Sequence, residues 1–163
     1  MHRQQSADVA ARVVLGGKVG PAIGAKEVDD PKAWYAGRMP GVLEEAYETL
    51  VAGKPLYLCG AFGGAAALAV ELVEGREAPA FSWEYQKRAP HSEGMRALYQ
   101  DREVPWIDYP DMRRRFADLG VAGLSRANGL SVDENRELFV ARDPTRIVAL
   151  LLEGMTKALR APG

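Results

Sequence analysis

Two glycine-rich turns offer the clearest chemistry in this sequence. In GKPLYLCGAFGGAAALAV (53–70), Gly60, Gly63 and Gly64 follow a short apolar run and precede an alanine-rich one. Glycine admits a positive φ and lets a ligand approach the backbone closely. The first amides of the helix that follows have no partner within it, and the helix dipole makes that end positive. The turn therefore predicts either an anion site or a tight turn with close helix–strand packing.

A second glycine pair ends another strand-like run, in LGGK (15–18). Ligands of open parallel sheets bind at the carboxyl ends of the strands, so we expect Gly16 and Gly17 beside the first turn. Lys18 either reaches an anion across that crevice or is an exposed loop lysine. Neither turn has the spacing of the dinucleotide fingerprint. Neither is a P-loop, because Val19 follows Lys18 where that motif needs Ser or Thr.

A third stretch, GRMPGVLEEA (37–46), places a cation and two acids around a helix start. Arg38 lies just before that start, where its guanidinium suits bidentate binding of phosphate or carboxylate. Glu44 and Glu45 fall near the first turn, where the dipole favours acids, and for Glu44 we prefer this interpretation. A carboxylate in that position also accepts hydrogen bonds from ribose hydroxyls.

Other catalytic or binding groups are scarce. Trp34 and Tyr35 either stack a nucleotide base or belong to the core or a pocket wall. His2 and His91 are the only histidines, and neither fits a catalytic triad or a metal-ligand spacing. The single cysteine, Cys59, lies in a buried-strand pattern and is interpreted as inert packing. We expect no metal site, and an enzyme of this sequence would depend on carboxylates or a bound water.

The composition is that of a globular protein of one domain. The 163 residues are 47% apolar and 26% charged, with a formal net charge of −1. That charge gives no global field to recruit nucleic acid or an anionic membrane. No apolar segment approaches the length of a membrane span, so we expect a cytoplasmic protein that binds neither nucleic acid nor a membrane.

Strands alternate with helices along the chain, which favours an α/β fold with a mostly parallel sheet. The predicted strands are ARVVLGG (11–17) and 55–59, and the predicted helices are 41–52, 62–73, 91–102, 109–118 and 144–159. Residues 75–90 are either an edge strand around AFSWEY or an irregular loop. SVDE (131–134) is a capping box, and Asp143-Pro144 marks the start of the last helix. We expect that helix to turn Ile147, Val148, Leu151, Leu152, Met155 and Leu159 inward.

Taken together, LGG, GRMPGVLEEA, GKPLYLCGAFGGAA and NGLSVDENRELF resemble the SLOG superfamily over residues 12 to 160. Its members are Rossmann-like nucleotide-binding domains and include the LONELY GUY phosphoribohydrolases. The resemblance implies a mostly parallel sheet with helices on both faces. It also implies one SLOG-like domain over residues 1–163, which is alternatively the C-terminal part of a longer protein.

The resemblance also bears on catalysis. Against the P-G-G-x-G-T-x-x-E motif of the phosphoribohydrolases, Gly41 aligns with the last glycine, Val42 with the threonine and Glu45 with the glutamate. The first Pro-Gly-Gly becomes Gly37-Arg38-Met39, which alters the phosphate loop. The family's catalytic arginine also has no counterpart in a matching upstream motif, and these two departures favour a domain that binds a nucleotide without cleaving it. A nucleoside monophosphate phosphoribohydrolase that uses Glu45 is the alternative, and a structural or oligomerisation module is a third.

The branch that the sequence resembles most is associated with bacterial TIR-type and sirtuin-type NAD-consuming defence proteins. It implies a sensor for a nucleotide signal of the ADP-ribose or cyclic ADP-ribose type, with no required cofactor. Further implications are a homodimer or tetramer and an attached or partner effector that contains a TIR or another NAD-consuming domain. The expected ligand-binding residues are Gly16, Gly17, Lys18, Arg38, Met39, Pro40, Gly41, Glu45, Gly60, Phe62, Gly63, Gly64 and Ala65, with Trp34 and Tyr35 stacking the base.

Overall fold

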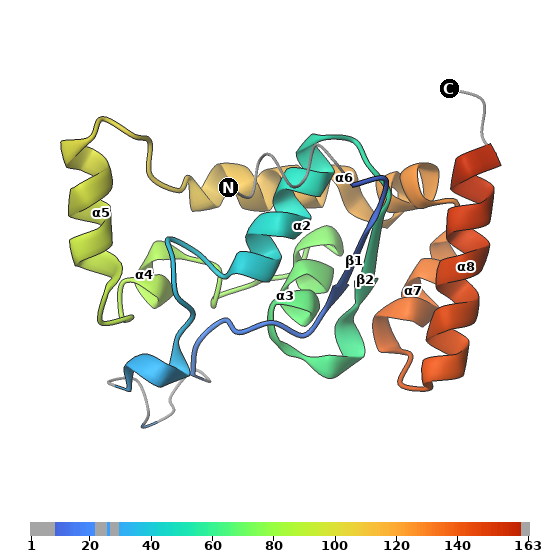
Figure 1. Ribbon diagram of the computed structural model, residues 1–163, viewed down its shortest axis with the longest axis horizontal. Coiled ribbons are helices and arrows are strands. Elements are labelled where there is room, and N and C mark those ends of the chain that lie inside the picture. Colours follow the sequence, from blue (N-terminus) through green and yellow to red (C-terminus); the bar gives the residue numbers. More distant parts are fainter. Residues whose placement is uncertain (1–8, 22–25, 27–29, 161–163) are drawn as a thin grey trace.

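The computed structural model describes residues 9–21, 26 and 30–160, and shows a mixed α/β fold (Figure 1). The strands are β1 (Arg12–Leu15) and β2 (Leu56–Cys59). The α-helices are α2 (Gly41–Val51), α3 (Gly64–Val73), α4 (Trp83–Gln86), α5 (Ser92–Asp101), α6 (Tyr109–Asn128), α7 (Val132–Val140) and α8 (Pro144–Arg160). Two short 3-10 turns, η2 (Pro31–Ala33) and η3 (Gly60–Phe62), precede α2 and α3.

The sheet of the described residues has two strands. β1 pairs with β2 in parallel, with Arg12 opposite Leu56 and Leu15 opposite Cys59, and α2 lies in the connection between them. The α/β class predicted from the sequence is confirmed. The larger sheet of a Rossmann-like fold stays a prediction.

Side chains of β2 alternate between two cores, as the pleat of a strand requires. Leu56 and Leu58 pack into the larger core with residues of α2, α3 and α6. Tyr57 and Cys59 pack into a smaller core with residues of α7 and α8. In Figure 1 the strands accordingly run between α2 and α3 on one side and α7 and α8 on the other. Cys59 is buried, as the sequence predicts, and burial raises the pKa of its thiol.

The start of α3 is fixed against the end of β1. The backbone N–H of Ala65 donates to the Gly17 carbonyl at 2.9 Å, and that of Ala66 donates to the Gly16 carbonyl at 2.8 Å. Such proximity requires glycine at position 64, because a Cβ there would lie 2.0 Å from the Gly17 oxygen. The small residues of the helix permit the same closeness, since Ala65, Ala66 and Ala69 are fully buried.

A buried polar network joins the α6–α7 corner to β2. The Asn128 side-chain amide donates to the Leu56 carbonyl and to Asn135 Oδ1, both at 2.8 Å. Its oxygen accepts the backbone N–H of Leu130, and the Tyr57 hydroxyl donates to the Asn128 carbonyl. The network satisfies polar groups that would otherwise be costly to bury.

The sequence-based expectation for residues 75–90 is wrong in its details. Neither an edge strand nor a purely irregular loop forms around AFSWEY, where the structure has the short helix α4. Ser82 caps this helix by accepting the backbone N–H of Tyr85. Tyr85 and its neighbour Gln86 are both buried, whereas the alternation of a half-buried strand would place them on opposite faces. The predicted helix 109–118 ends just before a kink at Gly120, whose φ of 58° and ψ of 178° are not helical, and a second helical segment that was not predicted continues α6 to Asn128.

The final helix begins as predicted and packs differently. Ser131 and Glu134 form the expected capping box of α7, and α8 starts at Pro144. The buried residues of α8 are Ile147, Leu150 and Gly154. Val148, Leu152 and Leu159, which we expected on the inner face, are 52%, 60% and 81% exposed. A close approach explains the difference, since a Cβ at Gly154 would lie 2.7 Å from the Tyr57 ring.

Gly64→Ala tests the contact between α3 and β1. We expect the free energy of unfolding to fall by more than about 2 kcal/mol, because the obstructing atom is backbone. Gly53→Ala is the matched control: its φ of +65° resembles the +63° of Gly64, but nothing lies within 4 Å of its Cβ. Left-handed strain alone costs about 1–2 kcal/mol there. Urea denaturation measures both variants, and equal losses would contradict a steric role for Gly64.

Candidate functional site

The structure brings the two glycine turns together. Their contact matches the interpretation as a tight turn with close helix–strand packing. Gly16 and Gly17 meet Gly64 and Ala65 at the carboxyl end of the sheet. The carbonyls of Gly16 and Gly17 accept the N–H groups of Ala65 and Ala66, two of the amides that an anion at the α3 N-terminus would use. That helix end is therefore largely occupied by the protein's own backbone.

The other glycines of this turn face a different part of the surface. Gly60 and Gly63 line a hollow of about 560 Å³ that also touches Arg76, Arg136 and Arg142. Phe62 is half-exposed beside them. Gly16, Gly17 and Gly64 are not part of the lining of this hollow, so the two glycine turns do not share it as one crevice.

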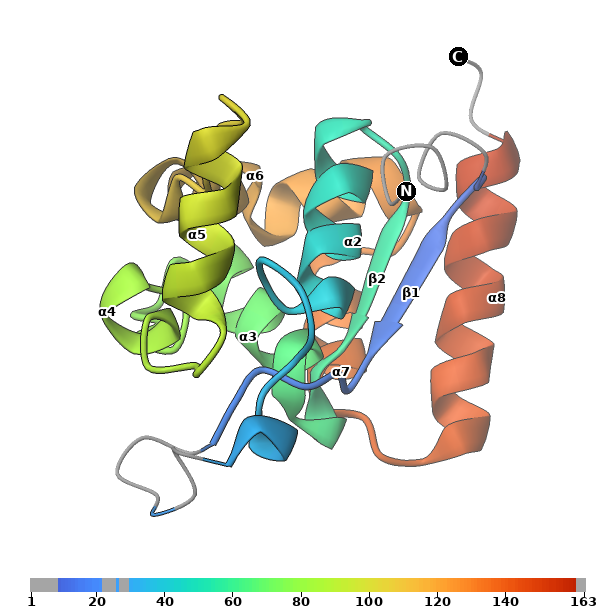
Figure 2. The ribbon, with the colours of Figure 1, turned by 60° about the vertical axis from the view of Figure 1, so that its left-hand side comes forward.

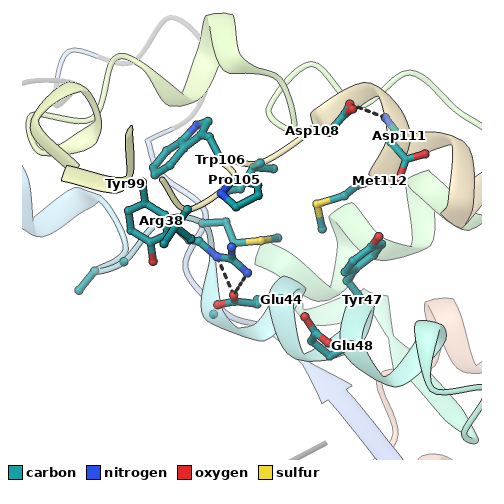
Figure 3. Close-up of a pocket in the computed structure, with 16 residues that line it drawn as sticks. Arg38, Glu44, Tyr47, Glu48, Tyr99, Pro105, Trp106, Asp108, Asp111 and Met112 are labelled. Atoms are coloured by element: carbon teal, nitrogen blue, oxygen red, sulfur yellow. Dashed lines mark hydrogen bonds and ion pairs between the residues drawn. The ribbon is translucent and has the colours of Figure 1, made fainter. Parts of the chain in front are cut away.

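A hollow of about 720 Å³ lies at the start of α2 (Figure 3). We call it the Arg38 hollow. From α2 and the segment before it come Arg38, Met39, Gly41, Glu44, Tyr47 and Glu48. From α5, α6 and the loop between them come Tyr99, Pro105, Trp106, Asp108, Asp111 and Met112. Three of the predicted ligand-binding residues, Arg38, Met39 and Gly41, thus share one cavity.

An ion pair spans part of this hollow. Arg38 donates from Nε and Nη2 to the same Glu44 oxygen, Oε1, at 2.9 and 2.7 Å. Figure 3 shows the guanidinium directed at Glu44, below Pro105 and Trp106. Among the described residues no hydrogen bond engages Arg38 Nη1 or Glu44 Oε2. Arg38 Nη1 therefore remains as a donor, and Glu44 Oε2 as an acceptor, for a ligand. Both side chains are only partly exposed.

Acidic and aromatic groups complete the wall. Asp111 accepts hydrogen bonds from Arg115 and Arg114, which lower the pKa of its carboxyl group. Asp108 caps α6 by accepting the backbone N–H of Asp111 at 2.9 Å. Their oxygens thus have partners in the protein. Glu44 and Glu48 lie on the α2 side, opposite Tyr99 and Trp106, so carboxylates face flat rings across the cavity.

Glu45 points elsewhere. It forms an ion pair with Arg12 of β1, and Arg12 Nε also donates to Thr49 Oγ1 at 3.0 Å. This carboxylate therefore ties α2 to the sheet and does not line the Arg38 hollow. Glu44, which we interpreted from the sequence as helix-end electrostatics, is the acid that lines it.

Three more of the expected residues also have partners outside the hollow. Lys18 donates from Nζ to the Lys32 carbonyl at 2.7 Å. Trp34 and Tyr35 are buried in an aromatic cluster with Tyr85, where the rings of Trp34 and Tyr85 are 5.3 Å apart. The Tyr35 hydroxyl donates to the Gln86 side chain at 2.6 Å, and burial raises the pKa of Tyr35. These contacts match the core interpretation of Trp34 and Tyr35, which we left open from the sequence. Pro40 is also buried, at the N-cap of α2.

Sequence reasoning missed the far wall of the hollow. Tyr99, Trp106, Asp108 and Asp111 lie more than fifty residues after Arg38 in the chain, and no local motif links them to α2. The one signal available was Pro105-Trp106, a proline and a large aromatic side by side between two predicted helices.

Two classes of site are not found in the part of the chain that the structure describes. Its His, Cys, Asp and Glu side chains form no group of three or more suited to a metal ion. Across those same residues, none of the helices combines the length and the apolar character needed to cross a bilayer.

Comparison with protein families identifies the class. The family model SLOG cluster2 matches residues 1–138, and the chain therefore belongs to this SLOG family. Membership implies a nucleotide-related domain. No curated protein and no solved structure gave a significant match to the chain.

A double-mutant cycle tests the structural role of Glu45. Arg12→Gln and Glu45→Gln should each lower the free energy of unfolding by about 0.5–1 kcal/mol, because the pair is only partly exposed. The double variant should lose less than the sum of the two, since each single change already breaks the pair. Chemical denaturation measures all three. Strict additivity would show that Glu45 does not act through Arg12.

Proposed function

We propose that this chain is a nucleotide-binding sensor domain whose ligand occupies the Arg38 hollow. The observation that supports this most is the Arg38–Glu44 pair at the start of α2, within a cavity lined by aromatic rings. SLOG membership supports a nucleotide as the ligand class. The ADP-ribose or cyclic ADP-ribose type is the ligand that we favour.

Each part of such a ligand has a complementary group in the hollow. A phosphate group binds Arg38 and lies near the N-terminus of α2. There Gly41 leaves open space, and the helix dipole favours an anion. Ribose hydroxyls donate to the acceptor that Glu44 retains. The base packs against Trp106 or Tyr99, whose rings are 5.2 Å apart and nearly perpendicular.

We propose that the ligand is read rather than cleaved, and that its binding regulates an attached or partner effector in bacterial defence. The altered phosphate loop at Gly37-Arg38-Met39 supports binding without hydrolysis. The effector, a TIR-type or other NAD-consuming protein, is supported by the resemblance to that branch. We also propose the Rossmann-like arrangement of that family for the fold.

Binding is tested by calorimetry and thermal shift with ADP-ribose, cyclic ADP-ribose, NAD and AMP. At least one should raise the melting temperature, because a ligand of the native state stabilises it. Arg38→Gln should weaken that binding tenfold or more, whereas Arg126→Gln, an exposed arginine on α6, should not.

A matched pair at Gly41 localises the effect. Gly41→Asp brings a negative charge into the hollow and should abolish binding, while Gly41→Ala should retain it because its Cβ meets nothing within 4 Å. No response to any of the four compounds would contradict the proposal. Release of free base from AMP that Glu44→Gln or Glu45→Gln abolishes would favour the phosphoribohydrolase instead.

We further propose that the chain self-associates through α8, as a homodimer or tetramer. On α8, an exposed apolar stripe at helical spacing is formed by Val148, Leu152 and Leu159. Figure 2 shows α8 at the outer edge of the molecule, beside β1. Leu152→Glu should shift the species to monomer in light scattering, with unchanged helix content. Glu153→Gln, also exposed on α8 but about 100° around the helix from Leu152, should leave the oligomer intact. A monomeric wild-type protein would contradict this proposal.

A further inference from the structure

A second hollow, of about 470 Å³, adjoins the first. It shares Trp106, Ile107 and Asp108 with the Arg38 hollow and is otherwise lined by residues of α4, α5 and the start of α6. We call it the Trp83 hollow. In Figure 1, α4 and α5 lie at the end of the molecule away from α8. None of the residues expected from the sequence to bind a ligand lines it.

Buried polar atoms without partners concentrate here. Among the described residues, four buried side-chain polar atoms have no hydrogen-bond partner. Three of them, Arg96 Nε, Trp106 Nε1 and the Tyr109 hydroxyl, belong to residues that line the Trp83 hollow. Tyr109 is 4% exposed. An unpaired buried polar group destabilises the fold, so three around one hollow call for a partner that the protein does not supply.

The charges around the hollow point to the kind of partner. The Arg96 guanidinium stacks over the Trp83 ring at 4.7 Å, which holds it in place. Neither Arg96 nor Arg113, which also lines the hollow, has an ion pair within the described part of the chain. The acids are engaged, since Glu84 pairs with Lys87 and Asp108 caps α6. The hollow therefore presents cations and hydrogen-bond donors in excess of acceptors.

We propose that the Trp83 hollow is a binding site for a small oxyanion, a phosphate or carboxylate, that is carried on a flat ring. Arg96 and Arg113 bind the anionic group, and the Trp106 indole N–H and the Tyr109 hydroxyl donate to it. The indole rings of Trp83 and Trp106, 6.2 Å apart and nearly perpendicular, enclose the flat part of the ligand.

The site does not depend on the N-terminus of α6, because Asp108 already accepts an amide there. Burial raises the pKa of Tyr109, so its hydroxyl remains protonated and able to donate at neutral pH. The proposal for this site does not rest on the nucleotide proposed for the Arg38 hollow, although Trp106 is part of both walls.

Four probes separate the chemistry: phenyl phosphate, benzoate, inorganic phosphate and uncharged benzyl alcohol. We expect phenyl phosphate or benzoate to bind in calorimetry, with inorganic phosphate at least tenfold weaker and benzyl alcohol not binding. The chain has three tryptophans, so its indole N–H groups give three assignable NMR signals. The one lost in Trp106→Phe should shift on binding, because that N–H gains an acceptor.

Variants keep the test decisive. Arg96→Gln should weaken phenyl phosphate at least tenfold, while Arg38→Gln and the exposed control Arg126→Gln should not change it. Tyr109→Phe should leave stability unchanged or raise it, since it removes an unpaired buried hydroxyl, yet still weaken binding. Binding of none of the four probes, or equal binding of benzyl alcohol and phenyl phosphate, would overturn the proposal. Loss of probe binding in Arg38→Gln would overturn the assignment to this hollow, whatever the outcome with nucleotides.

Discussion

The donation of two α3 amides to the carbonyls of Gly16 and Gly17 is the constraint on which the rest of this structure depends. It fixes the end of β1 to the start of a helix that is buried along most of its length. The same two bonds engage the helix end at which a phosphate would bind in a nucleotide-binding fold. A packing requirement thus occupies the position that the glycine pattern assigns to a ligand, and the Arg38 hollow lies instead at the start of α2.

Residues of helix α2 face three different parts of the protein: the core, strand β1 and the Arg38 hollow. Leu43 and Ala46 are buried in the core, and Glu45 pairs with Arg12 of β1. Glu44 lies one position, or about 100°, away and faces the Arg38 hollow. Adjacent glutamates therefore have different functions: one attaches the helix to the sheet, and the other holds the arginine beside the cavity. Alignment by motif cannot separate them, because the difference arises from helix rotation against the strand.

Structural features that depend only on residues close together in the chain could be predicted from the sequence. The capping box of Ser131 and Glu134 and the start of α8 at Pro144 are local, and both form as expected. The direction in which α8 faces is not local, because it depends on the close approach of Gly154 to Tyr57. The candidate site divides in the same way. The position of Arg38 beside a helix start could be predicted from the local sequence. Trp106, in contrast, reaches the cavity only through the packing of α5 and α6.

Trp106 also relates the two hollows to one another. The Arg38 hollow has four carboxylates around one paired arginine, and the Trp83 hollow has two arginines without acidic partners. The indole is part of both walls, with edge-to-face contacts to Tyr99 at 5.2 Å and Trp83 at 6.2 Å. A ligand that moves this ring from one side changes the shape of the other side. Thermodynamic linkage then requires that each ligand alter the affinity of the other by the same factor. Because Trp106 lies in the short segment 102–108 that joins α5 to α6, the position of its ring depends on how those two helices pack.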